Sequence, residues 1–241
     1  MQGWFRALWR FFYFILSTIF HIAGFVIDII LGKPKKAART NLKRKWLDQV
    51  PPGMGLEFSF EGNPDQGTCL FVSNHIGYLD PFAILMHVDA NLVAKSEVSR
   101  WPLIGLAGYL AGTIFVNRDK KSSRSETAEA IRRALEDQTS ILVFPEGTTS
   151  AGHVILPFRP RSFEAANLAG VPVQPIVITY DHPAVAFIDD HTFIPHFFRL
   201  FQIKEIKGHV VFGPLFIGAN TCNEARHWME QVQSFNAVKE V

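Results

Sequence analysis

Residues 69–81 read CLFVSNHIGYLDP, an apolar run followed by a polar turn and a proline. An apolar run this short, bounded by turn residues, is typical of a buried strand. A proline is tolerated in the first turn of a helix. The stretch therefore predicts a strand over Cys69–Ser73 and a helix that begins near Pro81, with Asp80 as its N-cap. A buried strand that leads directly into a helix is the repeating unit of layered α/β folds.

The same alternation continues on both sides of this stretch. Six more short apolar or β-branched runs predict strands at Leu56–Phe60, Leu92–Ala94, Gly112–Val116, Ile141–Phe144, Val173–Thr179 and His209–Phe212. Helical patterns lie between them at Pro81–Val88, Leu103–Leu110, Ser123–Asp137, Arg161–Ala169 and Asn223–Phe235. In the clearest helix, Ser123 and Glu126 have the spacing of a capping box. We therefore expect an α/β fold with a mixed, largely parallel sheet flanked by helices.

Composition narrows the class of protein further. Hydrophobic residues make up 48% of the 241 residues and charged residues 19%, which excludes a disordered or collagen-like chain. The two cysteines, Cys69 and Cys222, lie far apart, which argues against a disulfide scaffold and a structural zinc site. A change of pattern after Pro51 and Pro52 predicts a helical segment over 1–50 and a single α/β domain over 51–241.

The N-terminal segment has the features of a membrane-binding region. Phe11 to Leu31 form an apolar stretch of 21 residues, long enough for a helix to cross a bilayer. His21, Gly24 and Asp28 place a polar stripe along one face, and a carboxylate near the bilayer centre is costly. A helix that lies in the membrane interface, or packs its stripe on a partner, fits this pattern better than a free span.

Charge in the first fifty residues points to the same partner. This segment holds nine Lys or Arg and two Asp or Glu, a net charge of +7 against +2 for the whole chain. Basic residues next to an apolar helix are attracted to anionic lipid at ~1 kcal/mol each. A cleaved signal peptide is the alternative, but the apolar run is long for one and no small-x-small cleavage site follows it.

Three loops that follow predicted strands carry residues suited to chemistry, at the sheet edge where open α/β folds bind ligands. His75 and Asp80 lie five residues apart in the turn after Cys69–Ser73, so the carboxylate can reach the imidazole of a general base. The loop PEGTTS at 145–150 offers glycine and hydroxyl groups to an anion, and Arg118 ends the strand Gly112–Val116. Each of these features alone also fits a purely structural role.

Together the motifs are specific. NHxxxxD at 74–80, GxxFVxR at 112–118, FPEGT at 144–148 and VPVQPI at 171–176 follow the order of the four blocks of the glycerolipid acyltransferase family, which the chain resembles from about residue 56 to 213. Bacterial lysophosphatidic acid acyltransferases look most similar. The resemblance implies that His75 is the general base and Asp80 its orienting partner. It also implies that 171–176 shape the site and that the substrate is bound by Asn74, Phe115, Arg118, Glu146, Gly147, Thr148 and Arg159.

Two positions depart from the family pattern. Many members carry Arg after EGT, where this chain has Thr149, whereas Arg159 keeps a cation in the place of a common Lys. The stretch EGTTSAGHVILPFR at 146–159 also looks like the subgroup that acylates lyso-ornithine lipid, whose head group is zwitterionic. The sequence ranks lysophosphatidic acid first, because Arg118 and Arg159 match the two charges of a phosphate monoester, and lyso-ornithine lipid second.

The expected reaction is acyl transfer from a thioester of coenzyme A or acyl carrier protein to the free hydroxyl of a lysolipid. We expect no metal or other cofactor, since this reaction needs a base and an oxyanion stabiliser, and no nucleic-acid partner. The resemblance implies a bacterial inner membrane location with the acyltransferase domain, 51–241, on the cytoplasmic side. A hydrolase with the same dyad and a non-enzymatic membrane-binding protein are the alternatives. Arg118 and Arg159 argue mildly against the hydrolase, because water needs no anion clamp.

Overall fold

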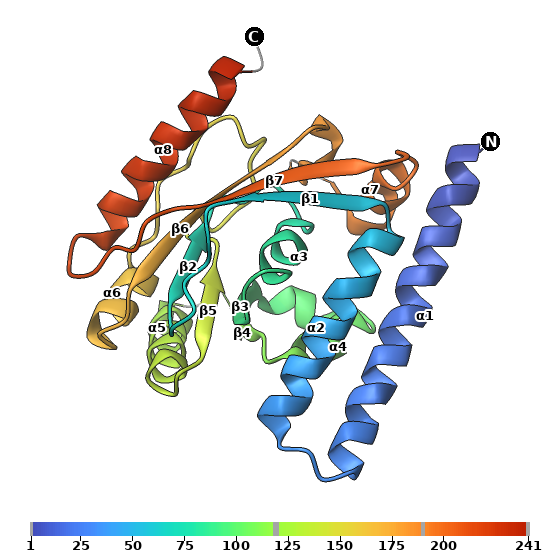
Figure 1. The fold of residues 1–241 in the computed structure, drawn as a ribbon, viewed down its shortest axis with the longest axis horizontal. Helices are drawn as coiled ribbons and strands as arrows, with labels where there is room; N and C mark the ends of the chain where they lie inside the picture. Colours follow the sequence, from blue (N-terminus) through green and yellow to red (C-terminus); the bar gives the residue numbers. More distant parts are fainter. Residues whose placement is uncertain (1, 118–120, 189–190, 240–241) are drawn as a thin grey trace.

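The fold is one mixed sheet with helices on both faces (Figure 1), seen in a computed structural model that describes residues 2–117, 121–188 and 191–239. The strands are β1 (Leu56–Glu61), β2 (Leu70–Ser73), β3 (Ala90–Lys95), β4 (Ile114–Val116), β5 (Ser140–Val143), β6 (Val173–Tyr180) and β7 (Ile206–Phe212). Their order in the sheet is β1-β7-β6-β2-β5-β3-β4. Every neighbouring pair is parallel except β6 and β7, which confirms the predicted sheet type.

Eight α-helices lie in the described part of the chain. They are α1 (Gln2–Ile30), α2 (Lys35–Gly53), α3 (Asp80–Leu85), α4 (Ile104–Ala111), α5 (Lys121–Glu136), α6 (Arg161–Leu168), α7 (Phe193–Leu200) and α8 (Thr221–Lys239). Two short 3-10 turns, Ser96–Arg100 and Pro183–Val185, complete the set. The sequence predicted all seven strands but not α7, whose Pro195 reads as a loop signal although proline is tolerated in the first turn of a helix.

The strand β2 lies at the centre of the sheet and separates two cores. All four of its residues are buried. Phe71 belongs to a core that also holds residues of α3, α7 and the N-terminal helices, whereas Leu70 and Val72 belong to a second core with α5 and α6. Because successive side chains of a strand point to opposite faces, this division requires helices on both sides of the sheet. A centre buried in this way fixes the loop that leaves β2 firmly in place.

The two N-terminal helices form a hairpin that packs against the domain (Figure 1). Ala7, Val50 and Met54 are buried in the same core as Phe71. The guanidinium of Arg10 donates to the carbonyl oxygens of Phe201, Ile203 and Lys204, which follow α7, at 3.2, 2.6 and 2.7 Å. The helix α2 continues to Gly53, with Pro51 and Pro52 inside it. The hairpin is therefore packed and hydrogen-bonded against the α/β domain, while the division at residue 50 stays a prediction.

Two predicted helix starts differ in detail from the structure. The helix α5 begins at Lys121, so Ser123 lies inside it and the predicted capping box with Glu126 is wrong. Asp80 is the first residue of α3, and Leu79 takes the N-cap position. The carboxylate of Asp80 turns away from the helix toward the loop before it, where it accepts hydrogen bonds from Ile76 and Gly77. The carboxylate of Asp80 therefore binds backbone N–H groups of the loop between β2 and α3 rather than those of the helix.

Candidate active site

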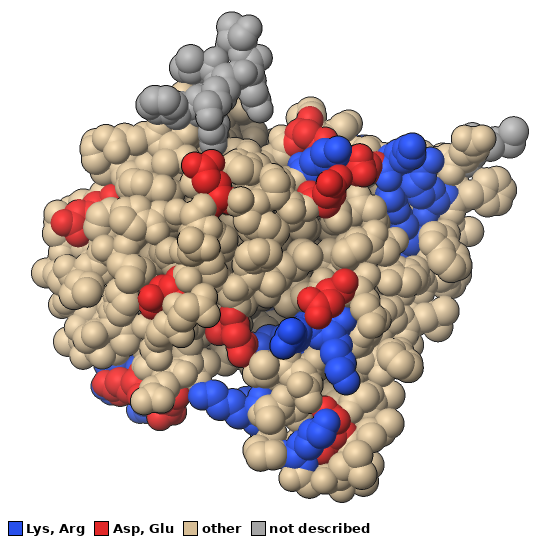
Figure 2. Space-filling model, viewed as in Figure 1, with Lys and Arg blue, Asp and Glu red and all other residues tan. Residues whose placement is uncertain are grey.

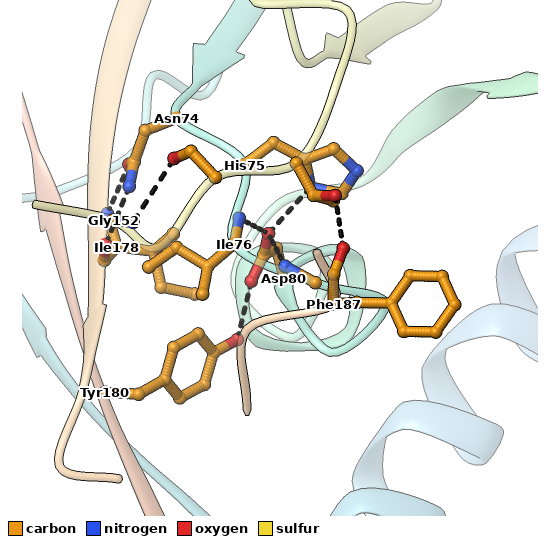
Figure 3. A network of polar contacts seen from close by, with 11 residues as sticks. Asn74, His75, Ile76, Asp80, Gly152, Ile178, Tyr180 and Phe187 are labelled. Atoms are coloured by element: carbon orange, nitrogen blue, oxygen red, sulfur yellow. Dashed lines mark hydrogen bonds and ion pairs between the residues drawn. The ribbon is translucent and has the colours of Figure 1, made fainter. Parts of the chain in front are cut away.

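The centre of the site is the loop between β2 and α3, which brings His75 and Asp80 together. His75 Nδ1 lies 2.7 Å from Asp80 Oδ2 (Figure 3). The Asp80 side chain is completely buried, whereas 19% of the His75 side chain is exposed. A carboxylate on Nδ1 fixes the tautomer in which Nε2 carries the free lone pair. His75 and Asp80 are therefore paired as the sequence predicts, and part of the imidazole is exposed.

Asp80 is held by four donors, which explains how a buried carboxylate is tolerated. Its Oδ2 accepts the backbone N–H groups of Ile76 at 2.7 Å and Gly77 at 2.9 Å in addition to His75. Its Oδ1 accepts the hydroxyl of Tyr180 at 2.9 Å. A buried charge is costly unless hydrogen bonds satisfy it. The charge of Asp80 is thus paired and satisfied before any substrate binds.

Asn74 shapes the loop from the other side. Its side-chain Nδ2 donates to the carbonyl oxygen of Ile178 at 2.9 Å, and its Oδ1 accepts the N–H of the same residue at 2.8 Å. The amide imitates one more residue of the β2–β6 ladder at the point where the backbone of β2 leaves the sheet. Asn74 is buried, and each end of its amide makes one of these two bonds. In this structure its amide orders the loop of His75, while the second N–H and the second lone pair of that amide take part in neither bond. Contact of Asn74 with substrate stays a prediction.

The loop after β5 forms the second wall of the site. The ring of Phe144 stacks on the imidazole of His75, with centroids 4.1 Å apart, and the N–H of Ser150 donates to the carbonyl oxygen of His75 at 2.8 Å. Glu146 is buried and accepts the N–H of Leu156 at 3.2 Å, while its Oε2 has no hydrogen-bond partner among the described residues. Burial raises the pKa of Glu146 to about 7. The motif FPEGT thus lies against the dyad, as its place in the sequence predicts.

The remaining predicted residues lie in several places. Gly147 has a left-handed backbone with φ of +74°, and a Cβ there would lie 2.5 Å from Cζ of Arg159, so the guanidinium sits against this glycine. Thr148 is exposed. Phe115 lines an apolar cavity between α2, α3 and α4. Arg118 is outside the described residues, so its role stays a prediction.

A segment that the sequence did not single out closes over the dyad loop. The N–H of Phe187 donates to the carbonyl oxygen of Ile76 at 2.9 Å, and its own carbonyl accepts the hydroxyl of Thr149 (Figure 3). A Cβ on Gly77 would lie 2.6 Å from the carbonyl oxygen of Val185. The segment therefore packs closely on both functional loops. In the sequence, the signal for this contact is Gly77, because a residue with a Cβ does not fit there.

Comparison with known proteins now identifies the family. Residues 55–179, just over half of the chain, match the family model described as Acyltransferase. The chain belongs to the acyltransferase family. It is 31% identical over 180 residues to the lyso-ornithine lipid O-acyltransferase of Pseudomonas aeruginosa, a match that covers 71% of this chain and 68% of that protein. It is also 32% identical over 127 residues to the 1-acyl-sn-glycerol-3-phosphate acyltransferase of Neisseria gonorrhoeae, covering 53% and 50%.

A solved structure supports the fold of this acyltransferase over its whole length. The crystal structure of the 1-acyl-sn-glycerophosphate acyltransferase of Thermotoga maritima superposes with a TM-score of 0.76 at 20% identity, covering 99% of this chain and 97% of that chain. At this identity the likeness concerns the fold alone. The predicted family and fold are confirmed. Within the described residues no group of three or more His, Cys, Asp or Glu is placed to hold a metal ion.

Proposed function

We propose that this acyltransferase moves an acyl chain from a thioester, carried by coenzyme A or acyl carrier protein, to the free hydroxyl of a lysolipid. The observation that carries the proposal is the 2.7 Å contact between His75 Nδ1 and Asp80 Oδ2, which leaves Nε2 as the proton acceptor. Nε2 removes the hydroxyl proton while the oxygen attacks the thioester carbonyl. The C–S bond then breaks, and the imidazolium returns the proton to the thiolate. The products are an ester and a free thiol.

Direct attack is favoured over an acyl-enzyme. Cys69 is buried, and burial raises the pKa of its thiol, so it is a poor nucleophile. Cys222 lies at the start of α8, and burial raises its pKa as well. The sequence contains no GxSxG nucleophile motif. In the proposed transfer, the dyad therefore activates the acceptor hydroxyl itself as the nucleophile.

The apolar cavity beside α3 is suited to an acyl chain. Its volume is about 170 Å³, and Pro81 and Phe82, which directly follow Asp80, form part of its wall. Residues of α1, α2, β3, α4 and β4 form most of the rest, mainly with apolar side chains that include Trp46 and Phe115. Concave apolar sites next to a few polar groups are the usual ligand sites of proteins. This position supports Phe115 as a substrate-contacting residue, as the sequence analysis expected.

For the acceptor we propose a zwitterionic lysolipid of the lyso-ornithine type, ahead of lysophosphatidic acid. Position 149 holds Thr where many relatives carry Arg, so it supplies no cation to a head group. The hydroxyl of Thr149 instead donates to the carbonyl oxygen of Phe187. The Pseudomonas relative, which matches 71% of this chain, carries the lyso-ornithine name. Lysophosphatidic acid, which the sequence analysis ranked first, becomes the second candidate, supported by Arg159, which lies against Gly147 in the same loop. A phosphate dianion would be held best by several cations.

The hairpin of α1 and α2 is proposed to lie on the membrane. The helix α1 is the one helix in the described residues that is long and apolar enough to cross a bilayer. Its outer face exposes large apolar side chains along most of its length, and the edge where it lies is largely uncharged in Figure 2. The exposed apolar side chains of α1 are Trp4, Phe5, Leu8, Trp9, Phe12, Leu16, Ile19, Phe20, Val26, Ile27, Ile29 and Ile30. An apolar surface of this extent marks a membrane or protein contact.

The way α1 is held supports an interfacial position. Arg6 donates to the carbonyl oxygen of Gln202 at 2.7 Å and Arg10 to three carbonyl oxygens nearby, so these contacts hold the start of α1 against the domain. Blue side chains gather over α2 in Figure 2, where they can meet anionic lipid. We propose the cytoplasmic side of a bacterial inner membrane as the location. There, soluble thioesters and membrane lysolipids are both within reach.

Competition kinetics test the acceptor. Purified protein receives lyso-ornithine lipid and lysophosphatidic acid at equal concentration with one acyl thioester, and mass analysis quantifies both products. The proposal predicts a kcat/KM ratio in favour of lyso-ornithine lipid. A ratio in favour of lysophosphatidic acid makes phosphatidic acid synthesis the function. Formation of free fatty acid alone contradicts acyl transfer to both.

A further inference from the structure

The second oxygen of Asp80 has a partner that lies far away in the sequence. Asp80 Oδ1 accepts the hydroxyl of Tyr180 at 2.9 Å, across 100 positions of the chain (Figure 3). Oδ2 meanwhile accepts His75 and two backbone N–H groups. The Tyr180 hydroxyl is thus the one donor to Oδ1 among the hydrogen bonds of the described residues. Together with the three donors to Oδ2, it fixes the rotation of the carboxylate about its bond to the Cβ.

The position of Tyr180 follows from the register of the central strands. Ser73 pairs with Ile176, and the amide of Asn74 extends this ladder to Ile178. Tyr180 comes two residues later, so its side chain points to the same face of the sheet as those of Ile176 and Ile178. That face carries α3, whose first residue is Asp80. The last residue of β6 is therefore fixed to the catalytic loop by the same strand pairing that forms the centre of the sheet.

The direction of this hydrogen bond is settled by charge. An ionised carboxylate can only accept, so the phenol donates. Burial and the nearby negative charge of Asp80 raise the pKa of Tyr180 far above its ordinary value, so the hydroxyl keeps its proton throughout the neutral range. A hydrogen bond to a charged, buried acceptor is stronger than a neutral one. The pair is therefore a permanent part of the resting site.

We propose that Tyr180 is a positioning residue for acyl transfer, whose hydroxyl holds the Asp80 carboxylate in the rotation that aligns Oδ2 with His75 Nδ1. The inference rests on the proposed function. Removal of the hydroxyl frees one side of the carboxylate, so that the contact between His75 and Asp80 is made for less of the time. A general base that is oriented for less of the time lowers kcat, while the binding of lysolipid and thioester is unchanged.

The test compares Tyr180→Phe with Tyr13→Phe. The ring of Tyr180 packs edge-on against Phe58 and is kept in the variant, so only the hydroxyl is lost. Tyr13 donates its hydroxyl to the carbonyl oxygen of Gln49 in the hairpin, and its variant is the matched control. We expect Tyr180→Phe to lose roughly tenfold in kcat with unchanged KM values, less than the ~10²–10⁴ expected when the base itself is removed. Tyr13→Phe should keep the wild-type kcat.

A double-mutant cycle separates positioning from a general structural effect. If Tyr180 acts through the carboxylate, Tyr180→Phe should change kcat less than about twofold in a protein that already carries Asp80→Ala. An equal tenfold loss in both backgrounds overturns the inference, because the tyrosine would then act without the carboxylate. An unchanged kcat in the single variant overturns it as well.

An NMR measurement without substrate tests the role of Tyr180 independently of the proposed acyl transfer. In protein labelled at histidine nitrogen, the Nδ1 proton of His75 gives a resonance that is assigned by its absence in His75→Ala. We expect this resonance to shift or disappear in Tyr180→Phe and to stay unchanged in Tyr13→Phe. An unchanged resonance in Tyr180→Phe overturns the inference even if acyl transfer is absent. Loss of acyl transfer in the wild type, with a shifted resonance in the variant, contradicts only the proposed function.

Discussion

Asp80→Asn is the substitution that tests the dyad most selectively. The amide oxygen can occupy the place of Oδ2 and still accept His75, Ile76 and Gly77, so the loop and the tautomer are kept. The amide nitrogen then faces Tyr180, whose hydroxyl can rotate to accept from it. The variant therefore removes the negative charge and leaves the hydrogen-bond frame in place. What is measured is the stabilisation of the imidazolium that forms during proton transfer.

The size of the effect follows from the geometry of the pair. Two unit charges about 4 Å apart attract by ~4 kcal/mol at an effective dielectric constant of 20, and a hydrogen bond to a charged group contributes ~1.5–3 kcal/mol. At 1.36 kcal/mol per factor of ten, these figures bracket a loss between roughly tenfold and thousandfold. We expect about a hundredfold loss of kcat for Asp80→Asn. His75→Ala should lose ~10²–10⁴, since it removes the base itself.

Thiol release from an acyl thioester, measured with saturating lysolipid, is the assay. Asp89→Asn is the control, because Asp89 is an exposed carboxylate that pairs with Lys43 away from the dyad. The double variant of His75→Ala and Asp80→Asn should equal His75→Ala within about twofold, because members of one unit are not additive. Two losses that multiply in full, or an Asp80→Asn variant as active as the wild type, would refute the reasoning.

Three further predictions concern the loop, the buried carboxyl and the hairpin. Thr149→Val loses the bond to the segment after β6 and should lower the melting temperature by about 2–4 °C, whereas Thr149→Arg should also depress kcat/KM for lyso-ornithine lipid. Burial raises the pKa of Glu146 to about 7, so the folded protein favours the neutral carboxyl group. The contribution of this group to the free energy of unfolding is therefore full below pH ~4.5 and is lost as the pH rises through 7. Glu146→Gln should therefore gain up to about 3 kcal/mol of unfolding free energy over the wild type between pH 5 and 8. Serine at Trp9, Leu16 and Phe20 together should weaken binding to anionic vesicles at least a hundredfold.

Each of these predictions has a matched control. Thr149→Ser keeps the hydroxyl and should keep the wild-type melting temperature, and a similar loss in Thr149→Ser and Thr149→Val would exclude the hydrogen bond as the cause. Parallel pH profiles of Glu146→Gln and wild type in thermal unfolding would show that Glu146 ionises normally. Leu168 and Ile217 are as exposed as the three hairpin residues, and serine at both should leave vesicle binding intact. Equal losses in the two membrane variants would place the membrane surface elsewhere.

Much of the fold was predictable because the chain alternates short apolar runs with amphipathic helices. Each of the seven strands was found, since buried strands read as apolar runs between turn residues. The dyad was predictable because His75 and Asp80 lie only five positions apart in one turn, so their side chains can meet whatever the order of strands in the sheet. Thr149 was noticed as a departure, but its bond to Phe187 joins segments 38 positions apart. Periodicity carries no information on such a contact.

Tyr180 shows why the rest of the site was not predictable. Nothing in the run VQPIVITY distinguishes its last residue from an ordinary tyrosine at the end of a strand. Its role depends on the order of strands in the sheet, which places β6 beside β2, and on the register that aligns Ser73 with Ile176. Asn74 is a similar case, because the family pattern suggests contact with substrate while the structure places its amide on Ile178. Both contacts depend on strand pairing rather than on local spacing.

The most direct test of the central claim measures where the acyl group goes. Wild type and His75→Ala are incubated with an acyl thioester, with and without lysolipid, and the ester, the free fatty acid and the released thiol are quantified. The account predicts one ester for each thiol released by the wild type, little thiol release without lysolipid, and loss of the ester in His75→Ala. Thiol release by the wild type that needs no lysolipid and yields free fatty acid would contradict it, because the dyad would then activate water.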